Sequence, residues 1–302
     1  PLEDDVVADE PIPTTQKAIF GYGYTTGIVS MSNLVNSSGV VATDVTGVGS
    51  ARFALAAASY GTDKAIFGYG KNGSNFSLTN LVSNSGVIAS DVTGVGTARR
   101  YLAAAGYGLD KAIFGYGTTG SLVSMSNLVN NSGVVASDVT GVGTARDQIA
   151  AAGYGVDKAI FGYGTTGSVS SLTNLVSNSG VVSADVTGVG TARSGAAAAS
   201  YGGDKAIFAY GNSGSNVSIS NLVNSSGVVA TDTTGVGTAR KDLAAAGYGG
   251  DKAIFGYGYV SGSPDRVSMS NLVSNSGVVA ADVTGVGTAR YSLAAVGYST
   301  SA

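Results

Sequence analysis

Short runs rich in apolar residues alternate with turn residues along the chain, and the third of six similar units shows the pattern clearly. Its four runs are YLAAAGY at 101–107, KAIFGY at 111–116, VSMSNLV at 123–129 and VVASDV at 134–139. Gly, Asn, Ser and Asp separate the runs, which is typical of strands joined by tight turns. No run is long enough to favour an amphipathic helix. The pattern predicts four antiparallel strands per unit, numbered here first to fourth in chain order.

The unit recurs at a fixed spacing. The phrase DKAIFGYG occurs almost unchanged six times, with lysines 47 residues apart at Lys17, Lys64, Lys111, Lys158, Lys205 and Lys252. Arginines close the units at Arg52, Arg99, Arg146, Arg193, Arg240 and Arg290, again 47 apart except for a last step of 50. A repeated four-stranded unit of this length is the blade of a β-propeller. We therefore predict an all-β fold, a six-bladed β-propeller of four-stranded antiparallel blades over residues 16–302.

The two ends of the repeat array complement each other. The first unit lacks its first strand, because acidic, proline-containing residues precede Lys17. The segment after Arg290, YSLAAVGY, is a first strand that no further unit follows. We expect this C-terminal strand to complete the first blade and close the ring, which leaves no partial sheet exposed. Residues 1–15 are expected to form an acidic linker or tail.

Composition excludes several classes of function. The chain has no Cys, His or Trp and a net charge of -3, so Cys or His catalysis, thiolate or imidazole metal sites and nucleic-acid binding are not expected. No apolar run is long enough to span a membrane. No catalytic residue, cofactor or metal is predicted. Because the chain begins with Pro and shows no signal peptide, we expect a processed product or a piece of a longer polypeptide.

The residues that differ between units gather in two places, the connection between the second and third strands and the positions after the repeated arginine. Most charged residues recur in every unit and are interpreted as scaffold. The charged and tyrosine residues that do not recur are Tyr24, Lys71, Arg100, Tyr101, Asp147, Lys241, Asp242, Tyr259, Asp265, Arg266 and Tyr291. Phe53 follows the same pattern. Both connections leave an antiparallel blade on the same face, so these residues form a candidate ligand-binding face. Drift at unconstrained loop positions is the alternative.

The order of strands, glycines and arginine resembles the kelch repeat over residues 17–298. The second strand ends in Phe-Gly-Tyr-Gly where kelch repeats carry a glycine doublet, here split by Tyr116 and its equivalents, and the fourth strand lacks the Trp of that family. The resemblance implies a propeller closed by its C-terminal strand. Near-identical repeats beginning DKAIFGYG are also similar to those of virion-associated proteins of aquatic bacteriophages.

These resemblances imply a non-enzymatic structural or binding propeller of a virion, such as a fibre, decoration or baseplate module, on a virion or extracellular surface. Its partners would be other virion or assembly proteins, through the N-terminal tail, and a glycan or host-surface protein, through the variable face. A pure scaffold, or an engineered or amplified array without a ligand, is the alternative. A glycan-active hydrolase is a more remote alternative, because glycosidases need a pair of carboxylates at a defined separation.

Overall fold

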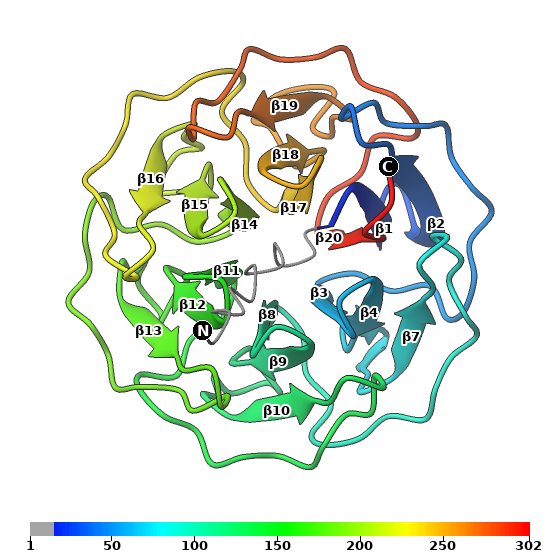
Figure 1. Ribbon diagram of the computed structural model, residues 1–302. Helices are drawn as coiled ribbons and strands as arrows, with labels where there is room; N and C mark the ends of the chain where they lie inside the picture. Colours follow the sequence, from blue (N-terminus) through cyan, green and yellow to red (C-terminus); the bar gives the residue numbers. More distant parts are fainter. Residues whose placement is uncertain (1–14) are drawn as a thin grey trace, which may run out of the picture.

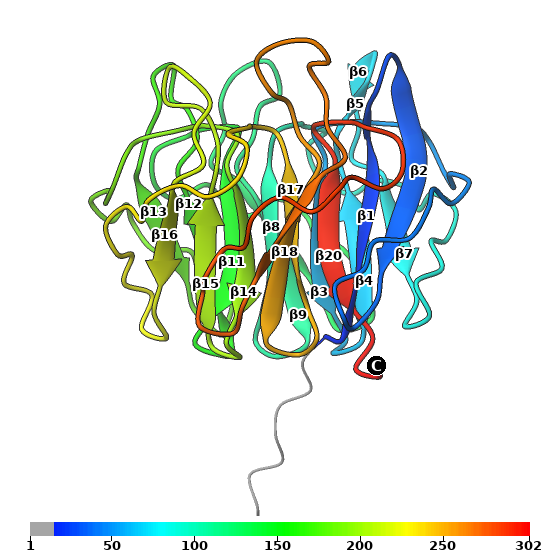
Figure 2. The ribbon, with the colours of Figure 1, turned by 90° about the horizontal axis from the view of Figure 1, so that it is seen from above.

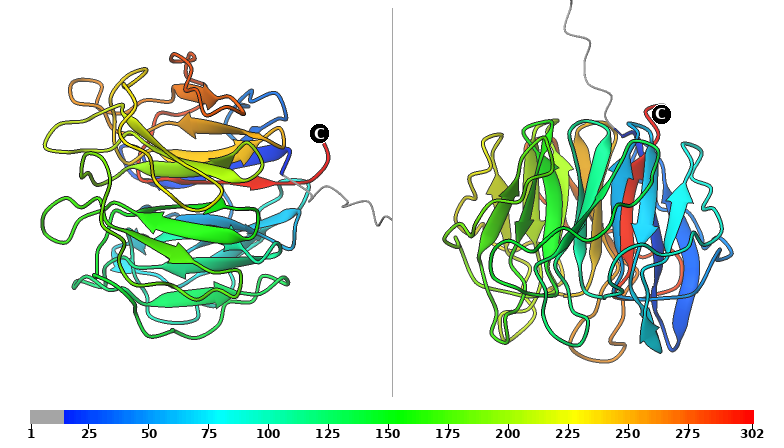
Figure 3. Two further views of the ribbon diagram at one scale, coloured as in Figure 1. Left: turned by 60° about the vertical axis from the view of Figure 1, so that its left-hand side comes forward. Right: turned by 90° about the horizontal axis from the view of Figure 1, so that it is seen from below.

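A computed structural model describes residues 15–302 of the protein. Residues 1–14, which make up nearly all of the expected acidic tail, lie outside the described part. Within it, twenty strands are arranged around a central axis (Figure 1). They form six three-stranded antiparallel sheets and one small two-stranded hairpin. The sheets stand side by side like blades, with their strands roughly along the axis (Figures 2 and 3). The predicted six-bladed, all-β propeller is confirmed.

Each blade has a short inner strand, a middle strand and an outer strand. From the axis outward, the first three blades are β20 (Ala294–Tyr298), β1 (Lys17–Tyr24) and β2 (Ile28–Val35); β3 (Ala56–Tyr60), β4 (Lys64–Gly68) and β7 (Thr79–Val82); and β8 (Ala103–Tyr107), β9 (Lys111–Gly115) and β10 (Ser126–Val129). The other three are β11 (Ala150–Tyr154), β12 (Lys158–Gly162) and β13 (Thr173–Val176); β14 (Ala197–Tyr201), β15 (Lys205–Ala209) and β16 (Ser220–Val223); and β17 (Ala244–Tyr248), β18 (Lys252–Gly256) and β19 (Ser270–Val273). The hairpin in the second blade consists of β5 (Lys71–Asn72) and β6 (Ser74–Asn75). Alanine and glycine fill the inner strands because six strands crowd around one axis.

The C-terminal strand closes the ring as predicted. Strand β20 pairs antiparallel with β1, in a register that places Tyr298 opposite Lys17 (Figure 1). Beyond the strands, the N–H of Gln16 donates to the carbonyl of Ser299 at 2.7 Å. The first blade is therefore assembled from both ends of the chain.

The prediction of a regular fourth strand in each blade is wrong. In the third blade the segment after β10 touches it through only two isolated bridges, Val129 with Val135 and Ser126 with Val139. Between these bridges the buried side-chain amide of Asn127 donates to the carbonyl of Ala136 at 3.0 Å. The side chain thus takes the place of a backbone partner, which interrupts the ladder. The same contact recurs in all six blades.

The apolar core lies between neighbouring blades rather than within one. The ring of Phe114 in the third blade meets Tyr69 of the second blade edge-on, with centroids 5.1 Å apart. A Cβ at Gly68 would come within 2.7 Å of Phe114, so glycine is needed for this close approach. Equivalent aromatic pairs join all the blades around the ring.

The repeated arginines are buried in the same interfaces. Arg146 lies over the ring of Tyr116 at 4.6 Å, and its Nε donates to the carbonyl of Tyr163 at 2.9 Å. Its guanidinium also donates to the side chain of Asn174. Because Tyr116 belongs to the third blade and the other two partners to the fourth, the arginine connects two blades.

The repeated aspartates make a second connection. The backbone N–H and the hydroxyl of Thr144 both donate to the carboxylate of Asp185 in the next blade, the hydroxyl at 2.6 Å. Partial burial opposes the charged form, but the hydrogen bonds from Thr144 and Asn174 outweigh it and hold the pKa of Asp185 below its ordinary value. The pair Thr288 and Asp44 repeats this contact across the closure. Most repeated charges are thereby part of the frame.

Candidate functional site

Six residues, one from the connection that enters each blade, surround the axis on one face. The backbone N–H of each donates to the carbonyl of its equivalent from the preceding blade, at 2.7–3.0 Å, and Ala54 donates to Ser292 to complete the circle. We call this circle the axial ring: Ala54, Tyr101, Gln148, Gly195, Asp242 and Ser292. The ring consists of backbone hydrogen bonds alone.

All members of the axial ring have a left-handed backbone, with φ between 48° and 61°, although only Gly195 is a glycine. This conformation costs a residue that carries a Cβ about 1–2 kcal/mol. Glycine would adopt it without that cost. Tyr101, Gln148 and Asp242 therefore hold large or charged side chains at positions where the backbone alone favours glycine.

A second circle surrounds the first. The residue before each ring member pairs with a residue of the connection between the middle and outer strands, again through two backbone hydrogen bonds. The pairs are Phe53 with Lys71, Arg100 with Thr118, Asp147 with Thr165, Ser194 with Asn212, Lys241 with Tyr259 and Tyr291 with Tyr24. Since these hydrogen bonds use backbone atoms alone, the side chains at these positions are free to differ.

The structure brings together all of the candidate residues predicted from the sequence. Tyr101 and Asp242 lie in the axial ring, and Arg100, Asp147, Lys241 and Tyr291 lie one residue before it. Tyr24, Lys71 and Tyr259 are the bridge partners, and Arg266 in turn bridges to Tyr259 beside Asp265. Every one of them is partly exposed. We call the surface that they form the variable face; in Figure 2 it is the upper face of the disc.

Five aromatic side chains form a continuous arc on the variable face. Ring centroids are 5.5 Å apart between Tyr259 and Tyr291, 5.5 Å between Tyr291 and Tyr24, 5.8 Å between Tyr24 and Phe53, and 6.5 Å between Phe53 and Tyr101. This aromatic arc crosses from the sixth blade through the first and second to the third. Phe53 is essential to its continuity, and its position directly after a repeated arginine is the sequence signal for it.

Charges of both signs flank the aromatic arc. The guanidinium of Arg100 lies 5.9 Å from the ring of Tyr101 and donates to Asn75 at 3.0 Å, and the ammonium of Lys241 lies 5.5 Å from the ring of Tyr259. Asp265 and Arg266 form an ion pair at 2.7 Å. Burial raises the pKa of Asp147, and the charge of Arg100 opposes that rise. The arc thus combines apolar ring surface with hydrogen-bonding groups.

The carboxylate of Asp242 differs in its surroundings from the other charged groups of the variable face. It lines an axial recess of about 70 Å³, formed by the axial ring and the residues that follow it. Burial raises the pKa of Asp242 to about 6, against the opposing charge of Lys241. Within residues 15–302, its side chain accepts no hydrogen bond and forms no ion pair. The sequence placed Asp242 on this face but gave no sign of the recess.

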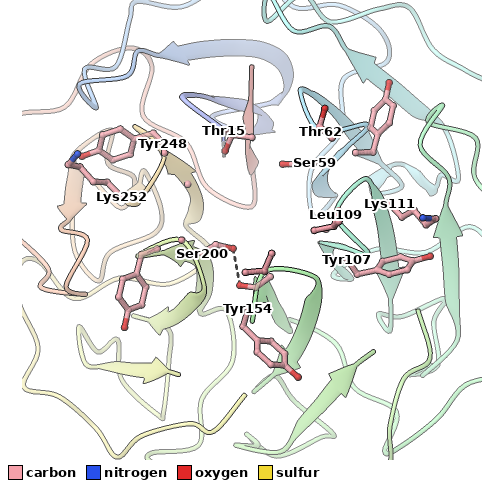
Figure 4. A pocket seen from close by; sticks show the side chains of 18 residues that line it. Thr15, Ser59, Thr62, Tyr107, Leu109, Lys111, Tyr154, Ser200, Tyr248 and Lys252 are labelled. Atoms are coloured by element: carbon pink, nitrogen blue, oxygen red, sulfur yellow. Dashed lines mark hydrogen bonds between the residues drawn. The ribbon is translucent and has the colours of Figure 1, made fainter. Parts of the chain in front are cut away.

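The opposite end of the axis is chemically plainer. An opening of about 190 Å³ is surrounded by the turns between inner and middle strands. Figure 4 shows Ser59, Leu109 and Ser200 around the opening, whereas the rings of Tyr107, Tyr154 and Tyr248 point away from it. The hydroxyl of Ser200 donates to the carbonyl of Gly153. Lys111 and Lys252 also point outward, so the opening presents hydroxyl groups and aliphatic side chains such as Leu109 (Figure 4).

Two further properties bear on function. In the part of the chain that the structure describes, no helix is long and apolar enough to cross a membrane. Across the same residues, no group of three or more Asp, Glu, His or Cys side chains is placed to hold a metal ion.

Comparison with known proteins supports the fold alone. No protein-family model matches the chain, and no curated protein matches it. Among solved structures, one similar chain is a fungal alcohol oxidase of the AA5 family, described as a complex with copper. The two share 12% sequence identity at a TM-score of 0.54, over 91% of this chain but only 65% of the oxidase chain. At that identity the likeness extends to the propeller architecture and not to the oxidase's chemistry.

Proposed function

We propose that the protein is a non-enzymatic propeller that binds a glycan or a protein through its variable face. The observation that carries the proposal is the axial ring, where Tyr101, Gln148 and Asp242 keep side chains in a left-handed backbone. Random drift would favour glycine there, because glycine adopts this backbone without the cost that a Cβ brings. Strained residues that persist at a surface are typical of positions selected for contact with a ligand.

The aromatic arc supports the same proposal. Tyrosine, together with arginine, is enriched where proteins bind partners, because it offers a large contact area and a directional hydroxyl. The arc presents its rings on a rigid frame of backbone hydrogen bonds, so little conformational entropy is lost on binding. The variable residues Tyr24, Tyr291 and Arg100 then recognise the ligand, while the repeated residues maintain the frame.

The non-enzymatic part of the proposal rests on chemistry. The chain has no His and no Cys, which are the commonest general bases and nucleophiles. On the variable face, Asp265 is neutralised by Arg266 at 2.7 Å. A pair of working carboxylates, such as a glycosidase needs, is therefore not favoured.

The place of the protein in a virion or extracellular assembly is also part of the proposal. It is supported by the resemblance of the DKAIFGYG units to repeats of phage virion proteins. In that setting the propeller would be tethered through residues 1–15 and would present the variable face outward. Thr15, the first described residue, lies at the axial opening on the face opposite the variable one, which suits this orientation (Figure 4).

A binding screen tests the proposal. The purified chain is applied to a glycan array and to host-surface extracts beside the triple variant Arg100→Ala, Tyr101→Ala, Tyr291→Ala. Hot-spot truncations of Tyr and Arg each cost about 2 kcal/mol or more, so we expect binding to fall at least 30-fold, or about 2 kcal/mol.

The matched control is Thr62→Ala, Leu109→Ala, Val156→Ala, which removes three exposed side chains from the opposite face. This control should bind like the parent, and thermal melts should show that all three proteins are folded. Equal binding by the parent and the variable-face variant would refute the proposal, as would a parent that binds nothing.

A further inference from the structure

Among residues 15–302, the carboxylate of Asp242 fits a space left for it but has no hydrogen-bonding or ionic partner. A Cβ at Gly195, the neighbouring member of the axial ring, would come within 2.8 Å of Asp242 Oδ1. Gly195 thus leaves the space that the carboxylate occupies. The residue before it, Lys241, has its ammonium over the ring of Tyr259 and forms no ion pair with Asp242. The carboxylate therefore faces the axial recess without a directly paired cation.

The frame does not require an acid at this position. The equivalent residues in the other blades are Ala54, Tyr101, Gln148, Gly195 and Ser292, and all of them complete the ring through backbone atoms. Asp242 is only partly exposed, and a carboxylate that is partly removed from water is less favourable without a partner than with one. A ligand that carries a positive charge would supply the missing partner.

The surroundings of Asp242 also favour a cation. Burial and, next, the charge of Asp242 raise the pKa of Tyr101, and the same charge contributes to the raised pKa of Tyr291. Tyr101 lines the recess together with Asp242, and Tyr291 directly precedes Ser292, whose N–H donates to the backbone carbonyl of Asp242. Both tyrosines belong to the aromatic arc. Aromatic faces attract cations, and a carboxylate beside them adds a charge-assisted hydrogen bond.

The shape of the face limits what can reach the recess. On the variable face, the connections between middle and outer strands extend above the ends of the inner strands (Figure 2). The recess at the centre measures only about 70 Å³, which suits a small group such as an ammonium. A slender chain that lies along the aromatic arc can place one such group in the recess, whereas a broad protein surface cannot enter a space of this size.

We propose that the axial recess receives the protonated primary amine of an amino sugar, within a glycan that lies along the aromatic arc. The ammonium donates hydrogen bonds to Asp242, and the sugar rings pack against Tyr291, Tyr24 and Phe53. This inference rests on the proposed function, since it names the class of glycan that the variable face would bind.

The test compares two oligosaccharides that differ only at nitrogen, a tetramer of glucosamine and a tetramer of N-acetylglucosamine. Their binding is measured by isothermal titration calorimetry near neutral pH and constant ionic strength. We expect the parent to bind the amine form at least about tenfold more tightly, the effect of one hydrogen bond between charged groups.

Two substitutions locate the effect. Asp242→Asn preserves shape and removes the charge, so the preference for the amine should disappear. Asp204→Asn removes one negative charge from the opposite face, where Asp204 pairs with Lys205 at 2.8 Å, and should leave the preference intact. Thermal melts verify that both variants are folded.

Several outcomes would overturn the inference. A preference that survives in Asp242→Asn would place the amine elsewhere, and a parent that binds both tetramers equally, or neither, would leave no role for the amine. Equally tight binding of Nα-acetyl-lysine methylamide would assign the recess to a lysine side chain instead. If the array screen finds other glycans that need Arg100 and Tyr291, the proposed function stands although the inference fails. If the screen finds no ligand of any kind, both fail.

Discussion

Closure of the ring by the C-terminal strand gives the sharpest test of the fold. Deleting residues 290–302 removes β20 and Arg290, and with them the inner strand of the first blade. Strand β1 loses its partner over five residue pairs, from Lys17 with Tyr298 to Gly21 with Ala294. The interfaces that the first blade shares with its two neighbours lose their inner layer.

The magnitude of this loss follows from burial. Leu293, Val296 and Tyr298 are only 2–5% exposed. Burying side chains of this size contributes about 1.5–3 kcal/mol each, or roughly 5–9 kcal/mol for the three. The contacts of Arg290 with Tyr22, Asn33 and the ring of Tyr257 are lost as well. A whole domain is stable by only about 5–15 kcal/mol, so the truncated protein should melt far below the parent or fail to fold.

The control is a circular permutant in which residues 290–302 precede Thr15 and the chain ends at residue 289. The two ends to be joined already lie together, because Gln16 donates to Ser299 at 2.7 Å. The permutant should melt within a few degrees of the parent, since it keeps every contact within residues 15–302 and changes only their connectivity. Calorimetry measures both. A truncated protein that melts like the parent would show that the strand does not hold the ring closed.

Three further perturbations have defined outcomes. The pKa of Asp242 is raised from 3.8 to about 6, so the folded state should lose up to about 3 kcal/mol of stability as the pH rises through this interval. Urea unfolding measures this loss, which should be absent in Asp242→Asn. Asp185→Ala should lower the free energy of unfolding by about 1–3 kcal/mol above pH 4. This difference from the parent should shrink in more acidic solution, because the pKa of Asp185 is lowered in the folded state and its stabilising contribution is lost as the carboxylate protonates. Gly195→Ala should destabilise by about 1–2 kcal/mol and displace the carboxylate of Asp242 toward water, which carbon NMR would detect as a lower titration midpoint; an unchanged midpoint would contradict the packing described.

Sequence reasoning predicted the fold well because the repeat leaves few alternatives. The fixed spacing, the four runs per unit and the complementary ends together define a closed six-bladed ring, and each follows from residue positions alone. The fourth strand was predicted wrongly because VVASDV has the composition of a strand. What interrupts it is a contact from another segment, the amide of Asn127 on the carbonyl of Ala136, which no local pattern reveals.

The residues of the candidate site could be predicted from the sequence, but their arrangement in space could not. Comparing the units column by column placed Arg100, Tyr101 and Tyr291 on one face, because the topology of a blade fixes where its connections emerge. The axial ring was not predictable, since Tyr101 and Gln148 are not residues that signal a left-handed backbone. The available signs were Gly195 and Asp242 in the same column, because glycine adopts a left-handed backbone without cost and aspartate adopts it more readily than most residues.

The same physics explains why some positions repeat and others vary. Arg146, Asn174 and Asp185 bind through their side chains across a blade interface, so each interface needs the same set if six blades are to close at equal angles. Positions on the variable face are joined by backbone hydrogen bonds, which any residue can make. The insertion before Arg266 shows this tolerance, because β18 and β19 keep the register of the other blades despite the longer connection between them. A propeller of this kind can change its ligand without changing its fold. A recognition surface on a repeated scaffold therefore requires that the residues that differ between units be confined to one face, as they are to the variable face.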